Sequence, residues 1–141
     1  MLDFHFYHPI EVRYGDLDPQ GHVNNAKFLT YMEQARISYL KQVRLWEGSS
    51  FLDIGIILAD LHLTFRKAIH FGDPIRVGVC ISRLGNKSMT SEYRIEDARD
   101  GSEFAIGSSV LVAYDYHNAC SIPIPDEWRK AIIQFEGITG Q

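Results

Sequence analysis

The residues between Tyr14 and Phe28, YGDLDPQGHVNNAKF, include the side chains best suited to chemistry. Two carboxylates, Asp16 and Asp18, lie here with a histidine and two asparagines, directly before a predicted helix. A helix N-terminus has unpaired N–H groups and partial positive charge, so it can stabilise a carbonyl oxygen that becomes negative during acyl transfer. A carboxylate a few residues upstream can reach the same carbonyl carbon directly or through one water molecule.

The helix that must position these residues is predicted to follow Asn24, whose side chain suits an N-cap. Apolar side chains then recur at the three- and four-residue spacing of a mostly buried helix: Phe28, Met32, Ala35, Tyr39 and Val43. The pattern predicts a helix end between residues 46 and 48. Before the loop, residues 8–14 mix apolar and charged side chains in near alternation, which predicts a first strand.

The remainder of the chain has the alternation of half-buried strands, separated by turn-forming residues. Strands are predicted over residues 54–69, 75–81, 89–96 and 104–116, with a short helix from Pro125. One strand, one long helix and four antiparallel strands pack best as a curved sheet around a single buried helix. Such a sheet has an open edge, which pairing with the same strand of a second copy would cover.

The length of 141 residues predicts one domain over residues 1–141. The formal net charge is −4 and the lysines and arginines are scattered, which argues against a nucleic-acid partner. The N-terminus lacks signal-peptide features, and no apolar run approaches the roughly 20 residues that a membrane-spanning helix needs. The two cysteines, Cys80 and Cys120, form no disulfide framework, so we expect a protein of the reducing cytoplasm.

Several segments share features with a known family. The loop has the pattern D-x-D-x-x-G-H-V-N-N-x-x-[FY], which is fairly specific, and Glu33-Gln-Ala-Arg36 follows it in the helix. Weaker matches are AIHFGDP at residues 68–74, GNKS at 85–88 and IPIPD at 122–126. In this order, over about residues 8–128, they resemble the 4-hydroxybenzoyl-CoA thioesterase branch of the hot-dog superfamily. The resemblance implies an α+β hot-dog fold, a curved five-stranded antiparallel sheet around one long central helix, with a short C-terminal helix.

The resemblance implies an acyl-CoA thioesterase that uses no cofactor or metal and acts on an acyl-CoA substrate as a homodimer or a tetramer of paired dimers. Asp18 matches the family's catalytic aspartate, as nucleophile or as general base on water. The backbone N–H of Asn25 matches the oxyanion donor. Gly21 would let backbone and ligand approach closely. His22 would orient Asp18 or the loop.

Further residues are predicted to contact the substrate: Asn24, Glu33, Arg66, Lys87 and Ser88. Lys87 matches a basic position that can meet coenzyme A phosphates as a point charge. It is the one basic residue in the 85–88 turn, where some relatives carry two or three. We therefore expect nucleotide contacts from Arg66, Lys67 or Arg83 if the turn binds weakly. The sequence does not identify the acyl group.

Other interpretations of single residues stay open. Asp16 is expected to be structural, as loop acids usually are. Glu33 is expected to be a half-buried acid paired with Arg36, or else to act at the acyl pocket. The Asp16 loop begins like a calcium-binding loop, but the twelfth position is Lys27 where that pattern requires glutamate. The histidines also lack metal-ligand spacing.

Two other functions compete with thioester hydrolysis. One is a non-catalytic acyl-CoA-binding protein of the same fold, in which the motif serves recognition only. The other is a hot-dog hydratase or dehydratase, which would act through a histidine–acid pair. His62 or His70 would have to serve in that case, and neither lies in a recognisable pattern.

Overall fold

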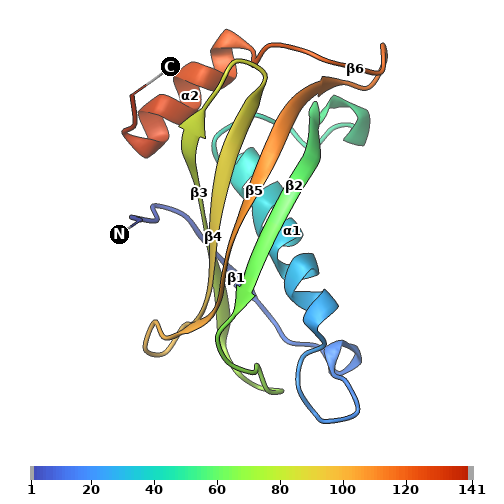
Figure 1. The fold of residues 1–141 in the computed structure, drawn as a ribbon, viewed down its shortest axis with the longest axis vertical. Coiled ribbons are helices and arrows are strands. Elements are labelled where there is room, and N and C mark those ends of the chain that lie inside the picture. Colours follow the sequence, from blue (N-terminus) through green and yellow to red (C-terminus); the bar gives the residue numbers. More distant parts are fainter. Residues whose placement is uncertain (1, 140–141) are drawn as a thin grey trace.

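One long helix packs against the concave face of a curved antiparallel sheet, as Figure 1 shows for the computed structural model, which describes residues 2–139. The elements are β1 (Tyr7–Ile10), the 3₁₀ turn η1 (Tyr14–Asp16), α1 (Asn25–Gln42), η2 (Phe51–Asp53), β2 (Ile56–Phe65), β3 (Ile75–Leu84), β4 (Ser88–Asp97), β5 (Glu103–Asp115), β6 (Cys120–Ser121) and α2 (Asp126–Glu136). The strand order is β1-β3-β4-β5-β2, and the two-residue β6 pairs with β5. The predicted α+β arrangement of one central helix, a curved sheet and a short C-terminal helix is confirmed.

The helix α1 begins where the sequence predicts but ends earlier. Asn24 Oδ1 accepts a hydrogen bond from the Ala26 N–H at 2.9 Å, as in an N-cap. The buried side chains of α1 are Phe28, Tyr31, Met32, Ala35, Arg36, Tyr39 and Leu40. The helix ends at Gln42, so the predicted end at residues 46–48 is wrong. Two residues later Arg44 has a φ of 62°, which a right-handed helix does not accommodate.

Two predicted strands are longer than the observed ones. The strand predicted over residues 8–14 becomes β1 and stops short, because the chain turns into η1. This turn is closed by the Arg13 N–H, which donates to Asp16 Oδ2 at 3.1 Å. The strand predicted over residues 54–69 becomes β2 and also stops short. Its next two amides both donate to the Phe104 carbonyl oxygen, so the regular ladder ends.

Gly107 on β5 lies where a side chain would meet both β2 and α1. A Cβ atom at Gly107 would lie 2.9 Å from the His62 carbonyl oxygen and 3.0 Å from Met32 Cε. Both distances are shorter than packed carbon atoms normally allow. The absence of a side chain at Gly107 therefore leaves room for the His62 backbone of β2 and for the Met32 side chain of α1.

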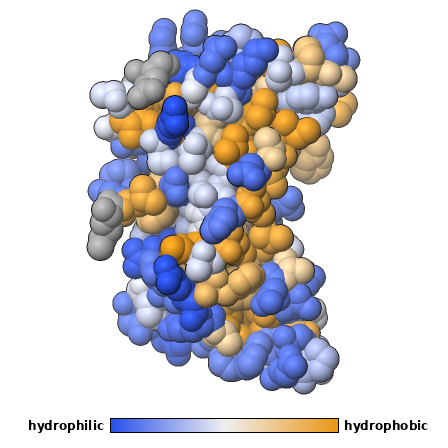
Figure 2. All heavy atoms as spheres, viewed as in Figure 1, coloured by the Kyte–Doolittle hydropathy of each residue, from blue (hydrophilic) through white to orange (hydrophobic). Residues whose placement is uncertain are grey.

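The strand β2 forms an open edge of the sheet, because it pairs only with β5. Several apolar side chains along it are exposed: Ile57 by 40%, Leu58 by 42% and Phe65 by 46%. Figure 2 shows hydrophobic atoms gathered along the side of the molecule where β2 and α1 lie. An exposed apolar strand edge favours pairing with another strand.

The C-terminal helix α2 is anchored by a buried carboxylate. Glu136 Oε2 accepts a hydrogen bond from the Tyr39 hydroxyl at 2.5 Å and another from the Ile81 N–H at 2.9 Å. These bonds join α2 to α1 and to β3. They satisfy a carboxylate that is only 9% exposed.

Candidate active site

The backbone around Asp18 forms a tight loop before α1, at the lower end of the molecule in Figure 1. Asp18 Oδ1 accepts hydrogen bonds from the Gln20 N–H at 2.9 Å and the His22 N–H at 3.1 Å. The Asp18 N–H donates to the His22 carbonyl oxygen at 2.8 Å. Within residues 2–139, Oδ2 of Asp18 accepts no hydrogen bond. One carboxylate oxygen is thus held by the loop, and the other is available to a ligand or a water molecule.

Gly21 makes this loop possible. Its φ is +81°, in the left-handed region that favours glycine. Its N–H donates to the Asp18 carbonyl oxygen at 3.0 Å, which closes the turn. Nothing lies within 4 Å of the position a Cβ would take, so the space beside Gly21 is open.

Asp16 ties the loop to α1. Its side chain is 1% exposed, and Oδ2 accepts a hydrogen bond from the Tyr31 hydroxyl at 2.7 Å. Its carbonyl oxygen accepts one from the Asn24 N–H at 2.8 Å. Burial by itself raises the pKa of Asp16, but hydrogen bonds from Tyr31 and Arg13, with nearby positive charge, bring it below the ordinary value. These are the contacts of a structural anchor, as expected from the sequence.

The first turn of α1 leaves one amide available. The Asn24 side chain caps the Ala26 N–H, and the Asn24 carbonyl oxygen accepts from the Lys27 N–H at 2.8 Å. The Asn25 N–H has no acceptor among residues 2–139. Asp18 and Asn25 line the same cavity of about 290 Å³, together with His22, Phe28, Phe65 and Arg66. The residue that carries the carboxylate and the residue that carries the free helix amide therefore border one cavity.

His22 lies against a residue far away in the sequence. It forms an isolated antiparallel bridge with His70, and their rings meet edge to face with centroids 4.9 Å apart. The backbone of His22 holds Asp18, while its ring packs on the loop between β2 and β3. No local pattern signals this contact, because it depends on where β2 ends. His62 lines a separate cavity together with Glu92 and Ser108. It therefore does not share a site with His22 and His70.

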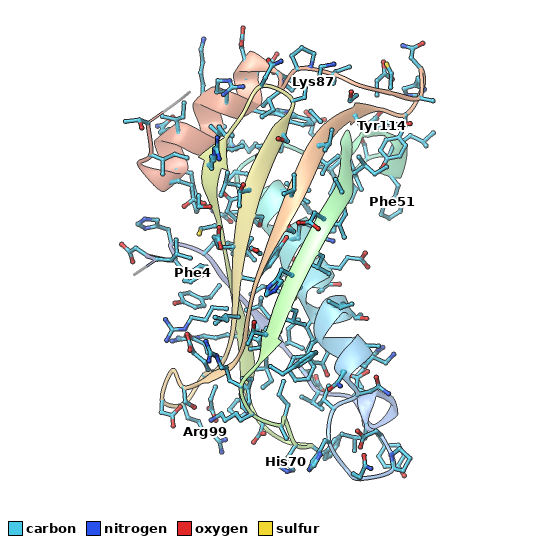
Figure 3. All side chains as sticks on the ribbon, in the orientation of Figure 1. Phe4, Phe51, His70, Lys87, Arg99 and Tyr114 are labelled. Carbon is cyan, nitrogen blue, oxygen red and sulfur yellow. The ribbon has the colours of Figure 1, made fainter. Side chains whose placement is uncertain are left out.

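The predicted nucleotide-binding residues do not all meet Asp18 within one chain. Arg66 lines the Asp18 cavity, next to Lys67. Lys87 lies in the turn between β3 and β4, and Ser88 is the first residue of β4. Figure 3 labels Lys87 at one end of the molecule and His70, the neighbour of His22, at the other.

Glu33 and Arg36 form the predicted ion pair, but the buried side chain is Arg36 and not Glu33. The side chain of Glu33 is 69% exposed, whereas that of Arg36 is 11% exposed, and their charged atoms are 3.9 Å apart. The expected half-buried acid is therefore wrong, because the buried partner is the arginine. Both residues line a second cavity farther along α1.

Other kinds of site have little support in the described part of the chain. Among residues 2–139, no three histidine, cysteine or acidic side chains are grouped so as to hold a metal ion. None of the helices in this range is long and apolar enough to cross a membrane. Burial raises the pKa of the Cys80 thiol to about 12, so that thiol is a poor nucleophile.

The fold, the family match and the similarity to solved thioesterases together define a hot-dog thioesterase, an enzyme that hydrolyses thioesters. The family model described as "Thioesterase-like superfamily" matches residues 12–132, and the chain belongs to this family. The predicted family and the hot-dog fold are therefore confirmed.

Individual relatives agree with this assignment. A structure of a thioesterase complexed with coenzyme A and Zn from Thermus thermophilus is 34% identical, covers 99% of this chain and 100% of its own, and superposes with a TM-score of 0.85. Long-chain acyl-CoA thioesterase FadM of Escherichia coli is 23% identical over 125 residues, or 89% of this chain and 95% of FadM. Acyl-CoA thioesterase YbgC of Haemophilus influenzae is 26% identical over 97 residues, or 67% of this chain and 71% of YbgC.

Proposed function

We propose that the protein hydrolyses an acyl-CoA thioester to a free carboxylic acid and coenzyme A, with Asp18 as the catalytic carboxylate. The observation that carries the proposal is that Asp18 and Asn25 line one cavity, and that the Asn25 N–H has no acceptor among residues 2–139. The names of the relatives FadM and YbgC support coenzyme A as the leaving group.

In the proposed reaction, the thioester carbonyl oxygen accepts a hydrogen bond from the Asn25 N–H. The charge that develops on this oxygen is stabilised there and by the helix N-terminus, and losing such a donor costs about 3–4 kcal/mol in the transition state. The free Oδ2 of Asp18 either attacks the carbonyl carbon or removes a proton from the attacking water. The C–S bond then breaks and coenzyme A leaves as the thiolate. Direct attack forms a mixed anhydride that a second step, with water, must hydrolyse.

The loop is suited to either route because it fixes the carboxylate before substrate binds. Two backbone amides hold Oδ1 of Asp18, which restricts rotation of the carboxylate. Asp16 and Tyr31 in turn fix the loop on α1. Single-turnover hydrolysis in ¹⁸O water tests for direct attack. Label found in Asp18 after one turnover shows that water opened an anhydride at the Asp18 carboxyl carbon, whereas general-base catalysis places the label in the acid product alone.

We further propose that the working unit pairs two chains through β2, as a homodimer or a dimer within a tetramer. Antiparallel pairing of the open β2 edges would cover Ile57, Leu58 and Phe65. A two-fold axis at this edge would bring the Lys87 end of one chain beside the Asp18 end of the other. This would explain how Lys87 and Ser88 could reach coenzyme A phosphates despite their distance from Asp18 in one chain.

The reduced state of Cys80 and Cys120 is compatible with the proposed cytoplasmic location.

The first experiment measures coenzyme A release from a panel of short, long and aromatic acyl-CoA thioesters. Asp18→Asn should lower kcat/KM at least about a hundredfold, the size of a general-base loss. Glu127→Gln makes the same chemical change at an exposed position on α2 and should leave kcat/KM unchanged. Binding without release by the wild type would favour the non-catalytic function, and water addition to an enoyl-CoA would favour the hydratase.

A further inference from the structure

A second cavity, of about 510 Å³, lies between α1 and the first half of β2. Its walls are largely apolar, with contributions from Ile37, Leu40, Ile54, Ile56 and Leu111. One buried charged side chain, Arg36, also lines it. The proposed mechanism makes no use of this charge.

Among residues 2–139, the guanidinium of Arg36 donates no hydrogen bond to a carboxylate. Nη1 donates a hydrogen bond to the Tyr93 hydroxyl at 3.0 Å, and that hydroxyl lies 2.9 Å from Ser109 Oγ. Both partners are neutral. The one carboxylate within 4.0 Å among residues 2–139 is Glu33, whose Oε2 is 3.9 Å from Nη2, beyond hydrogen-bonding distance. A guanidinium has five N–H donors. Within residues 2–139 one of these in Arg36 donates a hydrogen bond, so the others are available to a ligand in the cavity that Arg36 borders.

A carboxylate is the group that best satisfies such a guanidinium. It can accept two parallel N–H bonds, and it neutralises a charge whose burial is otherwise unfavourable. Glu33 would repel a bound carboxylate, but its side chain is 69% exposed and its field is screened by water. Arg36 is 11% exposed, and its attraction is screened less. The attraction therefore exceeds the repulsion.

The position of Arg36 along α1 sets which ligands could reach it. It lies eleven residues after Asn25, which is about 16 Å at 1.5 Å per residue. A cavity of about 330 Å³ lined by Asn25, Leu29, Leu61, Leu63 and Phe65 lies along the same side of α1 between these positions. An acyl group whose carbonyl lies at Asn25 could run along α1 beside β2. Its far end would reach Arg36 only if the acyl chain is long.

We propose that Arg36 binds a carboxylate at the far end of the acyl group, so that the preferred substrates are long-chain acyl-CoA thioesters of dicarboxylic acids. This inference rests on the proposed acyl-CoA thioesterase function and names the substrate class of the same site.

The test compares kcat/KM across a length series of saturated acyl-CoA thioesters, each prepared with a methyl and with a carboxylate far end. The ratio of the carboxylate form to the methyl form should rise with chain length and reach on the order of tenfold for the longest pair. Arg36→Met should bring this ratio to one or below. Arg36→Lys should retain part of it, because it keeps the charge without the planar fork. Glu33→Gln should raise the ratio, because it removes the opposing charge.

The ratio compares two substrates of one chain length on the same enzyme, so a general loss of activity in a poorly folded variant cancels. The change of this ratio with chain length in the wild type tests the inference without any variant. A wild-type ratio at or below one at every length overturns the inference while the thioesterase function stands. A third series with a hydroxyl far end serves as a neutral polar control, and a clear preference for it over the methyl and carboxylate series overturns the inference as well. If no thioester is hydrolysed, the proposed function fails instead, and calorimetric Kd values for the same pairs then test Arg36 directly.

Discussion

Replacing Tyr31 with phenylalanine should destabilise the loop that carries Asp18, because it removes a hydrogen bond from a buried carboxylate. The Tyr31 hydroxyl donates to Asp16 Oδ2 at 2.7 Å, and the two residues are 5% and 1% exposed. Water therefore cannot easily replace the lost donor. A hydrogen bond to a charged group contributes about 1.5–3 kcal/mol, so we expect a loss of about 2 kcal/mol. For a chain of this length that lowers Tm by roughly 5–8 °C.

The effect of Tyr31→Phe should depend on pH with a definite sign. The pKa of Asp16 in the folded protein lies below its ordinary value, so the folded state favours the charged carboxylate. Its contribution to stability is present above the unfolded pKa of about 3.9 and is lost as the pH falls through the lower folded pKa. The difference in unfolding free energy between wild type and variant should thus be largest near pH 7 and should decrease below about pH 4.

Urea unfolding followed by circular dichroism measures this difference, at one protomer concentration because pairing of chains would shift the midpoint. Tyr14→Phe makes the same chemical change where the side chain is 83% exposed, and it should alter stability by less than about 0.5 kcal/mol. kcat/KM should also fall for Tyr31→Phe, because the loop is less well held. Equal unfolding free energies for the two variants, or a difference that is the same at pH 7 and pH 3, would refute the reasoning.

Two predictions concern the packing of the sheet. Leu58→Asp places a charge on the open β2 edge, where Leu58 is 42% exposed, and should give monomers in sedimentation velocity; a variant that stays dimeric would contradict pairing through β2. Gly107→Ala should lower the unfolding free energy by about 1–3 kcal/mol, because its Cβ would lie 2.9 Å from a backbone oxygen that cannot easily move. Gly15→Ala, with nothing within 4 Å, is the matched control in the same urea titration, and equal losses would show that close approach is not the cause.

The main elements were predictable because their patterns are local. A period of three to four residues identifies the buried face of α1, and a period of two identifies the strands. Their ends were less predictable. β2 stops where two amides turn to the Phe104 carbonyl oxygen, a contact with a residue almost forty positions later. No pattern within the strand itself contains that information.

The arrangement of the loop before α1 was predictable for the same reason. Asp18, Gly21, His22 and Asn25 are close along the chain, and Asn24 signals the helix start by its side chain. The sequence by itself therefore determined that a carboxylate would lie near a helix N-terminus. It also indicated a thioesterase, which the family match confirms.

Only the tertiary structure decided how the more distant residues are arranged. Helical periodicity cannot tell which of two neighbouring polar side chains faces the sheet, and in α1 it is Arg36 rather than Glu33. The contact between His22 and His70 exists because β2 ends beside the loop. Lys87 lies at the end of the molecule opposite His70, because the turn that joins β3 to β4 is there. The order in which strands pair decides which loops meet, and that order is set by packing among residues far apart in the sequence.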